Sequence, residues 1–242
     1  MTLEGVTFDF WNTLMWERPG DLVAGRVAAW SEILAAAGVA QEHAALVAAH
    51  QVAFDEYQRA WRSNRSYQVP DAAASMVATL GLDLASVPHE RLIDAFSDAG
   101  LTTDLELADG IEGCLDDLRK AGLRIGIVCD VGLTPSPVLL RHLDRRGLLH
   151  HFDSVTFSDE VGVYKPDPAI FRHALHGLGI ATPAHVAHVG DRRRTDVAGA
   201  LGAGMVAVRY AGVFDDDVDL TPEADIVITD HAQLARSLGL VW

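Results

Sequence analysis

Cysteine is scarce in this chain. Among its 242 residues only Cys114 and Cys129 carry a thiol. Two cysteines are too few for a disulfide framework, which excludes a small secreted fold held by bridges and favours a reducing compartment. No basic-then-apolar leader follows Met1, so we expect no signal peptide and a cytoplasmic protein.

Positive charge and long apolar runs are also lacking. The net charge of −15 would repel polyanions, so we expect neither nucleic acid nor an anionic membrane as a partner. No apolar run approaches the roughly 20 residues that span a bilayer. The eleven His are scattered and show no metal-binding spacing. With 49% hydrophobic and 22% charged residues, the chain has an ordinary globular composition and is long enough for one or two domains.

Strand patterns are missing between residues 21 and 100. Apolar residues recur there at spacings of three and four, which predicts helices. Prolines at helix starts and glycines at helix ends give the boundaries. We expect four consecutive helices, at about 21–38, 46–63, 70–81 and 88–100, and a loop over 15–20.

Helices and strands alternate beyond Gly110. Short β-branched or apolar runs predict strands at 123–128, 154–157, 185–189, 205–208 and 225–228. Helical patterns fall at 111–121, 137–146, 168–178, 196–203 and 232–238. Such alternation is typical of a parallel sheet covered by helices on both faces, and the run at residues 6–8 predicts a first strand. The helical stretch is therefore interpreted as a module inserted after that strand.

Acidic residues follow several of the predicted strands. Asp9 ends the first strand, and Asp191 ends the strand at 185–189, with Asp196 five residues later. The loop after the 154–157 strand contains Lys165. A single Asp at a strand end is most often only a turn residue. However, the carboxyl ends of parallel strands meet at one sheet edge, where open α/β folds bind ligands. Three carboxylates gathered there need positive charge, and their hard oxygen ligands favour Mg²⁺ beside the lysine.

These segments resemble the four motifs of the haloacid dehalogenase (HAD) superfamily of hydrolases. The segment from Asp9 to Leu14 resembles motif I, the strand ending in Cys129-Asp130 resembles motif II, Lys165-Pro166 resembles motif III, and Gly190-Asp191 with Asp196 resembles motif IV. The helical insertion resembles a type C1 cap. The resemblance implies a Rossmann-like α/β core, a parallel sheet formed by residues 1–14 and 104–242. It also implies an all-α cap domain at 15–103 that closes over the site.

The resemblance also implies a mechanism. Asp9 would attack the substrate and form a covalent aspartyl intermediate that water hydrolyses. Mg²⁺ would bind Asp9, the backbone carbonyl of Trp11 and Asp191. Asp196 would orient this shell, although it could equally be the N-cap of the next helix. Lys165 would pair with the nucleophile and the transferred group; the alternative is a solvated loop lysine.

Two positions depart from the family pattern. Phosphatases of the family carry an acid–base Asp two residues after the nucleophile, where this chain has Trp11. The indole cannot exchange a proton, and such help is worth roughly 10²- to 10⁴-fold in rate. Trp11 could instead pack against the cap hinge. Cys129 stands where Ser or Thr usually binds phosphate, and its thiol is a weak donor that is reactive or, more often, inert. Asp130, beside it, fits the family pattern of substrate binding.

Basic and aromatic side chains supply further candidates. Arg192, Arg193 and Arg194 lie between Asp191 and Asp196, either as solvated charge or as a rim that recruits anions. The substrate selectors expected in the cap, each equally able to be cap core, are Trp16, Tyr57, Trp61 and Tyr67.

Three functions are compatible with this pattern. The first is a Mg²⁺-dependent phosphatase acting on a small phosphorylated metabolite. The second is a binding or scaffold protein that kept the fold but lost turnover, as Trp11 suggests. The third is a 2-haloacid dehalogenase that uses Asp9 without an essential metal. The partner that we expect is a small anionic substrate. The pattern identifies neither the substrate nor the oligomeric state.

Overall fold

The computed structural model describes residues 3–216 and 221–240. The chain forms two compact units. One comprises Met1–Trp16, Glu106–Asp130 and Leu143–Trp242, and is here called the core unit. The other comprises Glu17–Leu105 and Val131–His142, and is here called the helical unit. The helical unit therefore takes in the twelve residues that directly follow Asp130 as well as the long stretch after the first strand.

A six-stranded parallel sheet is the centre of the core unit. Its order is β5 (Ser154–Phe157), β4 (Arg124–Cys129), β1 (Gly5–Phe8), β6 (Val186–Gly190), β7 (Val206–Tyr210) and β8 (Ile226–Ile228). Neighbouring strands are all parallel. The predicted Rossmann-like α/β core is thereby confirmed. β1 is central because every residue from Val6 to Phe8 is buried and apolar or β-branched, as a strand covered on both faces requires.

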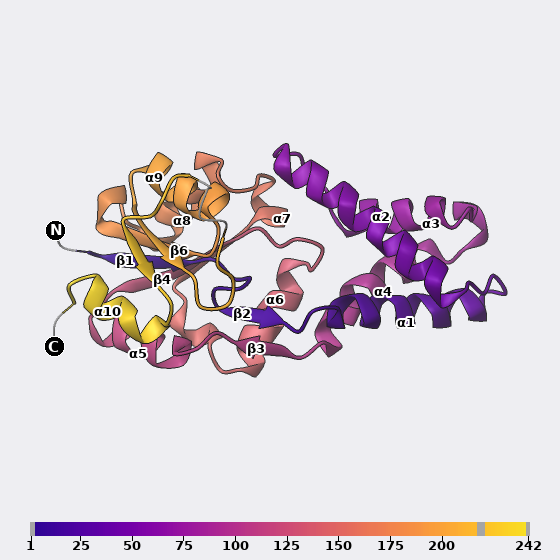
Figure 1. The fold of residues 1–242 in the computed structure, drawn as a ribbon, viewed down its shortest axis with the longest axis horizontal. Helices are drawn as coiled ribbons and strands as arrows, with labels where there is room; N and C mark the ends of the chain where they lie inside the picture. Colours follow the sequence, from indigo (N-terminus) through magenta and orange to yellow (C-terminus); the bar gives the residue numbers. More distant parts are fainter. Residues whose placement is uncertain (1–2, 217–220, 241–242) are drawn as a thin grey trace. The chain divides into compact units, whose positions relative to one another are not determined.

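Helices cover both faces of this sheet (Figure 1). α8 (Pro168–Leu178) and α9 (Ala198–Ala203) lie on one face, whereas α5 (Ile111–Lys120) and α10 (Leu234–Ser237) lie on the other. Side chains of α8, among them Ile170 and Phe171, pack with Val128 and Ala207 of the strands in a buried apolar cluster. The remaining short elements of this unit are η2 (Leu149–His151), α7 (Ser158–Val161), η3 (Pro183–His185), η4 (Arg193–Val197) and η5 (His231–Gln233).

Four helices form most of the helical unit, as the periodicity predicts. They are α1 (Asp21–Ala36), α2 (His43–Arg62), α3 (Val69–Thr79) and α4 (His89–Thr102), with a short η1 (Leu84–Ser86) and the first part of α6 (Ser136–Arg145). α1 packs on α4, and α2 packs on α3. α3 begins at a capping box, in which the Gln68 backbone N–H donates to Asp71 Oδ2 at 2.8 Å.

A buried arginine ties α1 to the segment that follows Asp130. Arg26 donates to the carbonyl oxygens of Phe96 and Leu133 and to the Thr134 hydroxyl. Its guanidinium also lies 4.3 Å from the centre of the Phe96 ring. A buried cation needs such partners, so these contacts explain why the 131–142 segment groups with the helices.

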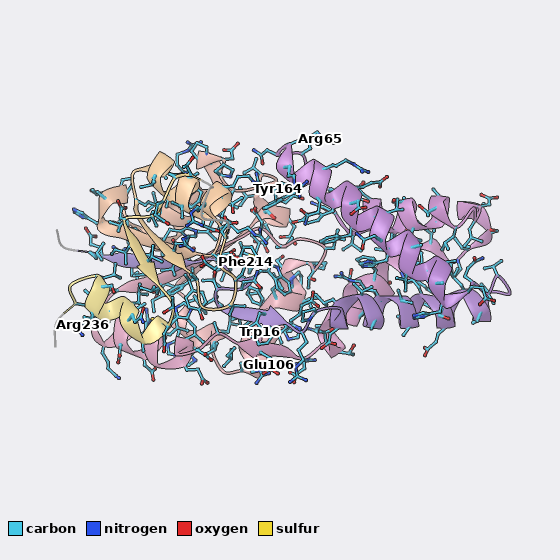
Figure 2. All side chains as sticks on the ribbon, viewed as in Figure 1. Trp16, Arg65, Glu106, Tyr164, Phe214 and Arg236 are labelled. Carbon is cyan, nitrogen blue, oxygen red and sulfur yellow. The ribbon has the colours of Figure 1, made fainter. Side chains whose placement is uncertain are left out.

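Two short strands are missing from the sequence prediction. β2 (Met15–Glu17) pairs with β3 (Leu105–Leu107) in a separate two-stranded sheet. Figure 2 labels one side chain of each strand, Trp16 and Glu106. The prediction of a loop over 15–20 is therefore wrong for its first residues, because three-residue strands are too short to show a period. Within 3–216 and 221–240, no helix is long and apolar enough to cross a membrane.

Candidate active site

The site lies where the order of the strands in the sheet reverses, between β1 and β6. From β1 the chain continues to β4 and β5 on one side of the sheet and later to β6 on the other. Asp9 follows β1 directly, and Asp191 follows β6, the strand beside it. The Asp9 backbone N–H donates to the Val189 carbonyl at 2.8 Å and so continues the ladder up to the acid. A crevice at the carboxyl ends of strands, at such a switch point, is where α/β sheets bind ligands.

Lys165 bridges two of the carboxylates. Its ammonium group donates to Asp9 Oδ1 at 2.6 Å, to Asp196 Oδ1 at 2.6 Å and to the Val128 carbonyl at 2.9 Å. The side chain is 2% exposed, so the interpretation of a solvated loop lysine is wrong. Burial opposes its charge, but Asp196 and Asp9 outweigh burial and raise the pKa of Lys165 well above its ordinary value. The site therefore contains a fixed ammonium ion.

The three acids form one oxygen-lined group. Carboxylate oxygens of Asp9, Asp191 and Asp196 lie within 4.8 Å of one another, and all three residues are buried. The Asn12 side-chain amide donates to Asp191 Oδ2 at 3.2 Å and orients that carboxylate. Asn12 adopts a φ of 56°, a left-handed conformation that Asn tolerates better than most residues. The structure thus brings together the acids that the sequence places at separate strand ends.

Electrostatics indicate that this group needs more positive charge. Burial raises the pKa of Asp191 to about 7, and the nearby Asp196 carboxylate adds to the increase. Burial also raises the pKa of Asp9, and the carboxylates of Asp196 and Asp191 add to the increase. The charge of Lys165 acts in the opposite direction but does not offset them, since Lys165 also pairs with Asp196. Oxygen donors alone, short of counter-charge, suit a hard divalent cation such as Mg²⁺. The residues present therefore fit the metal that the sequence suggested.

Asp196 has hydrogen-bond partners at both of its carboxylate oxygens. Its Oδ1 accepts from Lys165 and lies 3.2 Å from His188 Nε2; its Oδ2 accepts from the Arg192 backbone N–H at 3.0 Å and the Thr195 hydroxyl at 3.2 Å. Burial opposes its ionisation, but Lys165 and His188 lower the pKa of Asp196 below the ordinary range. Four partners occupy both oxygens, which fits a residue that orients its neighbours.

The alternative of a helix N-cap at Asp196 is wrong. The residue lies inside η4, which is a π-helical turn, and the N-cap of α9 is Val197. The turn brings the carboxylate back onto the strand end. A Cβ atom at Gly190 would lie 2.3 Å from Asp196 Cγ, so only glycine leaves room for the acid there.

His188 and Thr7 are site residues that the sequence did not reveal. His188 Nδ1 lies 2.9 Å from the Thr7 hydroxyl, and its Nε2 faces Asp196. Burial lowers the pKa of His188, so the ring is neutral. In a neutral ring whose Nε2–H donates to Asp196, Nδ1 accepts a hydrogen bond from the Thr7 hydroxyl. The two residues are register partners on β1 and β6, and nothing in a buried apolar strand distinguishes such a histidine beforehand.

The two departures from the family pattern have different surroundings. Trp11 is half-buried, and its ring meets Phe10 edge-on at 5.2 Å between centroids. Cys129 is fully buried, and burial raises the pKa of its thiol well above the ordinary value, which favours the inert interpretation. Asp130 Oδ1 accepts from the Lys165 backbone N–H at 2.9 Å, so this acid helps to position the lysine.

The three consecutive arginines do not share one environment. Arg193 is buried: its guanidinium donates to the Asp216 carbonyl at 2.7 Å and to Glu223 Oε2 at 2.7 Å. Arg192 is 39% exposed, and its Nε lies 3.8 Å from Asp191 Oδ2. Its guanidinium also lies 4.5 Å from the centre of the ring of Phe214, which Figure 2 labels. The prediction of solvated charge is therefore wrong for Arg193.

The suggested substrate selectors differ in burial. Tyr57 is buried in the helical unit, 6.5 Å from Tyr67 between ring centroids. Trp16 and Trp61 are half-buried. Tyr67 donates to Glu56 Oε2 at 3.1 Å. Substrate selection by any of these four residues stays a prediction.

Comparison with known proteins gives the family. The sequence profile of the haloacid dehalogenase-like hydrolases matches residues 3–204. The chain belongs to this family, as the four motifs indicate.

Individual relatives support the same assignment. The chain is 38% identical over 129 residues to a phosphoserine phosphatase of Thermus thermophilus, an alignment that covers 52% of this chain and 50% of that protein. It is 29% identical over 195 residues to haloacid dehalogenase-like hydrolase domain-containing protein 3 of Mus musculus, covering 72% and 75%. The chain thus spans about half the length of the first of these relatives.

Solved structures show the same fold. A 2-haloacid dehalogenase of Pseudomonas syringae superposes with a TM-score of 0.72 at 23% identity, covering 99% of each chain. A HAD phosphatase of Thermococcus onnurineus superposes with a TM-score of 0.65 at 24% identity, covering 98% of each chain. One fold therefore accompanies two chemistries among these neighbours.

Proposed function

We propose that the protein is a Mg²⁺-dependent phosphatase of a small phosphorylated metabolite, with Asp9 as its nucleophile. The observation that carries the proposal is the Lys165 bridge between Asp9 and Asp196, beside Asp191. This arrangement supplies a buried carboxylate nucleophile, a fixed cation and an oxygen-lined group for a metal. Two relatives support phosphate-ester chemistry over halide chemistry. They are the phosphoserine phosphatase and a glyceraldehyde 3-phosphate phosphatase of Methanopyrus kandleri, which is 42% identical over 95 residues, 39% of each chain.

Two displacements at phosphorus would complete the reaction. In the first, an Asp9 oxygen bonds to phosphorus as the ester oxygen leaves with the bonding electron pair and takes a proton from water. In the second, water attacks the phosphorus, the Asp9–phosphorus bond breaks, and inorganic phosphate leaves with the Asp9 carboxylate restored. Lys165 holds Asp9 in place and faces the charge that develops on the transferred group.

Asp9, Asp191 and the Trp11 carbonyl would hold the metal. Both oxygens of Asp196 already accept hydrogen bonds, so this residue would orient the metal-binding residues and would not bind the metal itself. When bound, Mg²⁺ supplies the positive charge that the buried acids lack and reduces repulsion between nucleophile and phosphate. We also propose that the protein acts in the cytoplasm, because two cysteines are too few for the disulfide framework of a small secreted fold.

Trp11 supports a second candidate, a binding protein with weak or no turnover. Without an acid at this position, an alkoxide leaving group must be protonated by water, at a cost of roughly 10²- to 10⁴-fold in rate. Esters with stable leaving groups, such as p-nitrophenyl phosphate, avoid that cost. We therefore expect the protein to hydrolyse aryl phosphates much faster than alkyl phosphates.

The test compares aryl and alkyl phosphates and 2-halo acids, with Mg²⁺ and with a chelator. Asp9→Asn should lower Mg²⁺-dependent phosphate release more than about 10³-fold. Trp11→Asp should accelerate alkyl esters by about 10² or more while barely changing aryl esters. Trp11→Phe, which removes the indole but adds no carboxylate, is the matched control.

Other outcomes would select the alternatives. Turnover that begins only in Trp11→Asp would favour the binding protein. Halide release that persists in the chelator would favour the dehalogenase. Phosphate release that survives Asp9→Asn would refute Asp9 as the nucleophile.

A further inference from the structure

Arg192 is a charged residue of the site that the proposed chemistry does not use. Its backbone N–H is fixed on Asp196 Oδ2, and its Nε lies 3.8 Å from Asp191 Oδ2. Asp191 belongs to the group of oxygens that lie within 4.8 Å of one another around Asp9. The guanidinium therefore lies at the edge of the acidic group, within the reach of a short carbon chain from a phosphate on Asp9.

We propose that Arg192 binds a second anionic group of the substrate. The inference rests on the proposed function and narrows it: the substrate would be a phosphate monoester that also carries a carboxylate or a second phosphate a few bonds away. A guanidinium presents its N–H donors as a planar fork that matches either anion with two parallel hydrogen bonds.

The guanidinium is held in a defined place. Its carbon lies 4.5 Å from the centre of the Phe214 ring. A ring contacts the flat face of a guanidinium, whereas hydrogen bonds leave through its edge, so the two interactions are compatible. The side chain is still 39% exposed, unlike its buried neighbour Arg193.

The chain beside Phe214 is anchored at Asp216. The Arg193 backbone N–H donates to Asp216 Oδ2 at 2.8 Å, and the Arg193 guanidinium donates to the Asp216 carbonyl at 2.7 Å and to Glu223 Oε2 at 2.7 Å. Arg209 donates to the other oxygen of Glu223 at 3.0 Å. A ring beside such an anchor restricts the guanidinium in advance, which reduces the entropy lost when an anion binds.

The charge of the site favours a cation such as Arg192 beside the substrate. Three carboxylates lie at the site of a protein whose net charge is −15, so a second anion on the substrate would meet repulsion. The three N–H donors of Lys165 are already directed to Asp9, Asp196 and the Val128 carbonyl. Arg192 can offset the repulsion of that second anion.

A simpler role for Arg192 is to stabilise the ionised form of Asp191. Arg192 does lower the pKa of that acid, although burial outweighs it and the net shift is upward. This role predicts the same loss for every phosphate ester when Arg192 is removed. The proposed role predicts a loss that depends on whether the ester carries a second anion.

The experiment therefore measures ratios of kcat/KM for esters of one chain length. Glycerol 3-phosphate has no second anion, 3-phosphoglycerate has a carboxylate, and glycerol 1,3-bisphosphate has a second phosphate. We expect the wild-type protein to prefer at least one of the two charged esters about tenfold or more. In Arg192→Met the preference should fall about tenfold. Arg194→Met, with the same charge change two residues further along the chain in η4, should keep it.

Each result has a consequence. Equal losses on all three esters in Arg192→Met, or an equal fall of the ratio in Arg194→Met, would overturn the proposal. A wild-type protein that hydrolyses all three esters without preference would overturn it and leave the phosphatase intact. No hydrolysis of any of the three esters would overturn the role of Arg192, and no hydrolysis of p-nitrophenyl phosphate in the same assay would overturn the phosphatase as well. If Arg192→Met does not fold, Phe214→Leu takes its place: it should lower the ratio, and Phe214→Tyr should restore it.

Discussion

Replacing Lys165 with Met tests the electrostatic basis of the site most directly. The ammonium group makes its three hydrogen bonds at 2% exposure, two of them to carboxylates. Its loss leaves Asp9 and Asp196 buried without their counter-charge. Removing one partner of a buried ion pair costs about 3 to 5 kcal/mol, so we expect the free energy of unfolding to fall by that amount at pH 7.

The assay is urea unfolding followed by circular dichroism, in a metal-free buffer so that added cations do not replace the lysine. Lys120→Met is the matched control. Lys120 is the other lysine of the chain, 68% exposed and paired with Asp117 at 3.1 Å, and we expect less than about 1 kcal/mol there.

A double mutant sharpens the test. If Lys165 and Asp196 stabilise one another, Lys165→Met with Asp196→Asn should cost less than the sum of the two single changes, by about 1 kcal/mol or more. Additive losses, or a Lys165→Met protein as stable as the wild type, would refute the claim that the buried bridge holds the site together.

Two further changes probe packing and pH. Gly190→Ala should destabilise the protein by about 1 to 3 kcal/mol in a thermal or urea scan, because the new Cβ would lie 2.3 Å from Asp196 Cγ; Gly202→Ala, with no atom within 4 Å, should be neutral or stabilising, and equal effects at the two positions would contradict the reasoning. Burial and Arg26 lower the pKa of His50 from 6.5 to about 4, so the folded state needs the neutral ring and its stability should fall as pH drops from about 6.5 towards 4. In His50→Phe, which keeps a ring stacked on Phe96, the loss of unfolding free energy between pH 6.5 and 4 should be smaller by about 3 kcal/mol; an unchanged pH slope would disprove the reasoning.

The local sequence determined the positions of the candidate catalytic carboxylates along the chain. Asp9 and Asp191 could be placed in advance because each ends a short buried run, and parallel strands bring such ends to one sheet edge. The four helices of the helical unit and their approximate ends were equally readable, since periodicity, prolines and glycines act within a few residues of each other. The family motifs rest on the same local features.

Only the tertiary structure decided how these residues are used. His188 looks like any buried strand residue until register places it between Thr7 and Asp196. Arg192 and Arg193 are adjacent and chemically identical, yet one is exposed beside Asp191 and the other is buried by a loop more than twenty residues later. Pairing across long sequence separations sets burial and hydrogen-bond partners, and no short-range pattern in the chain encodes it.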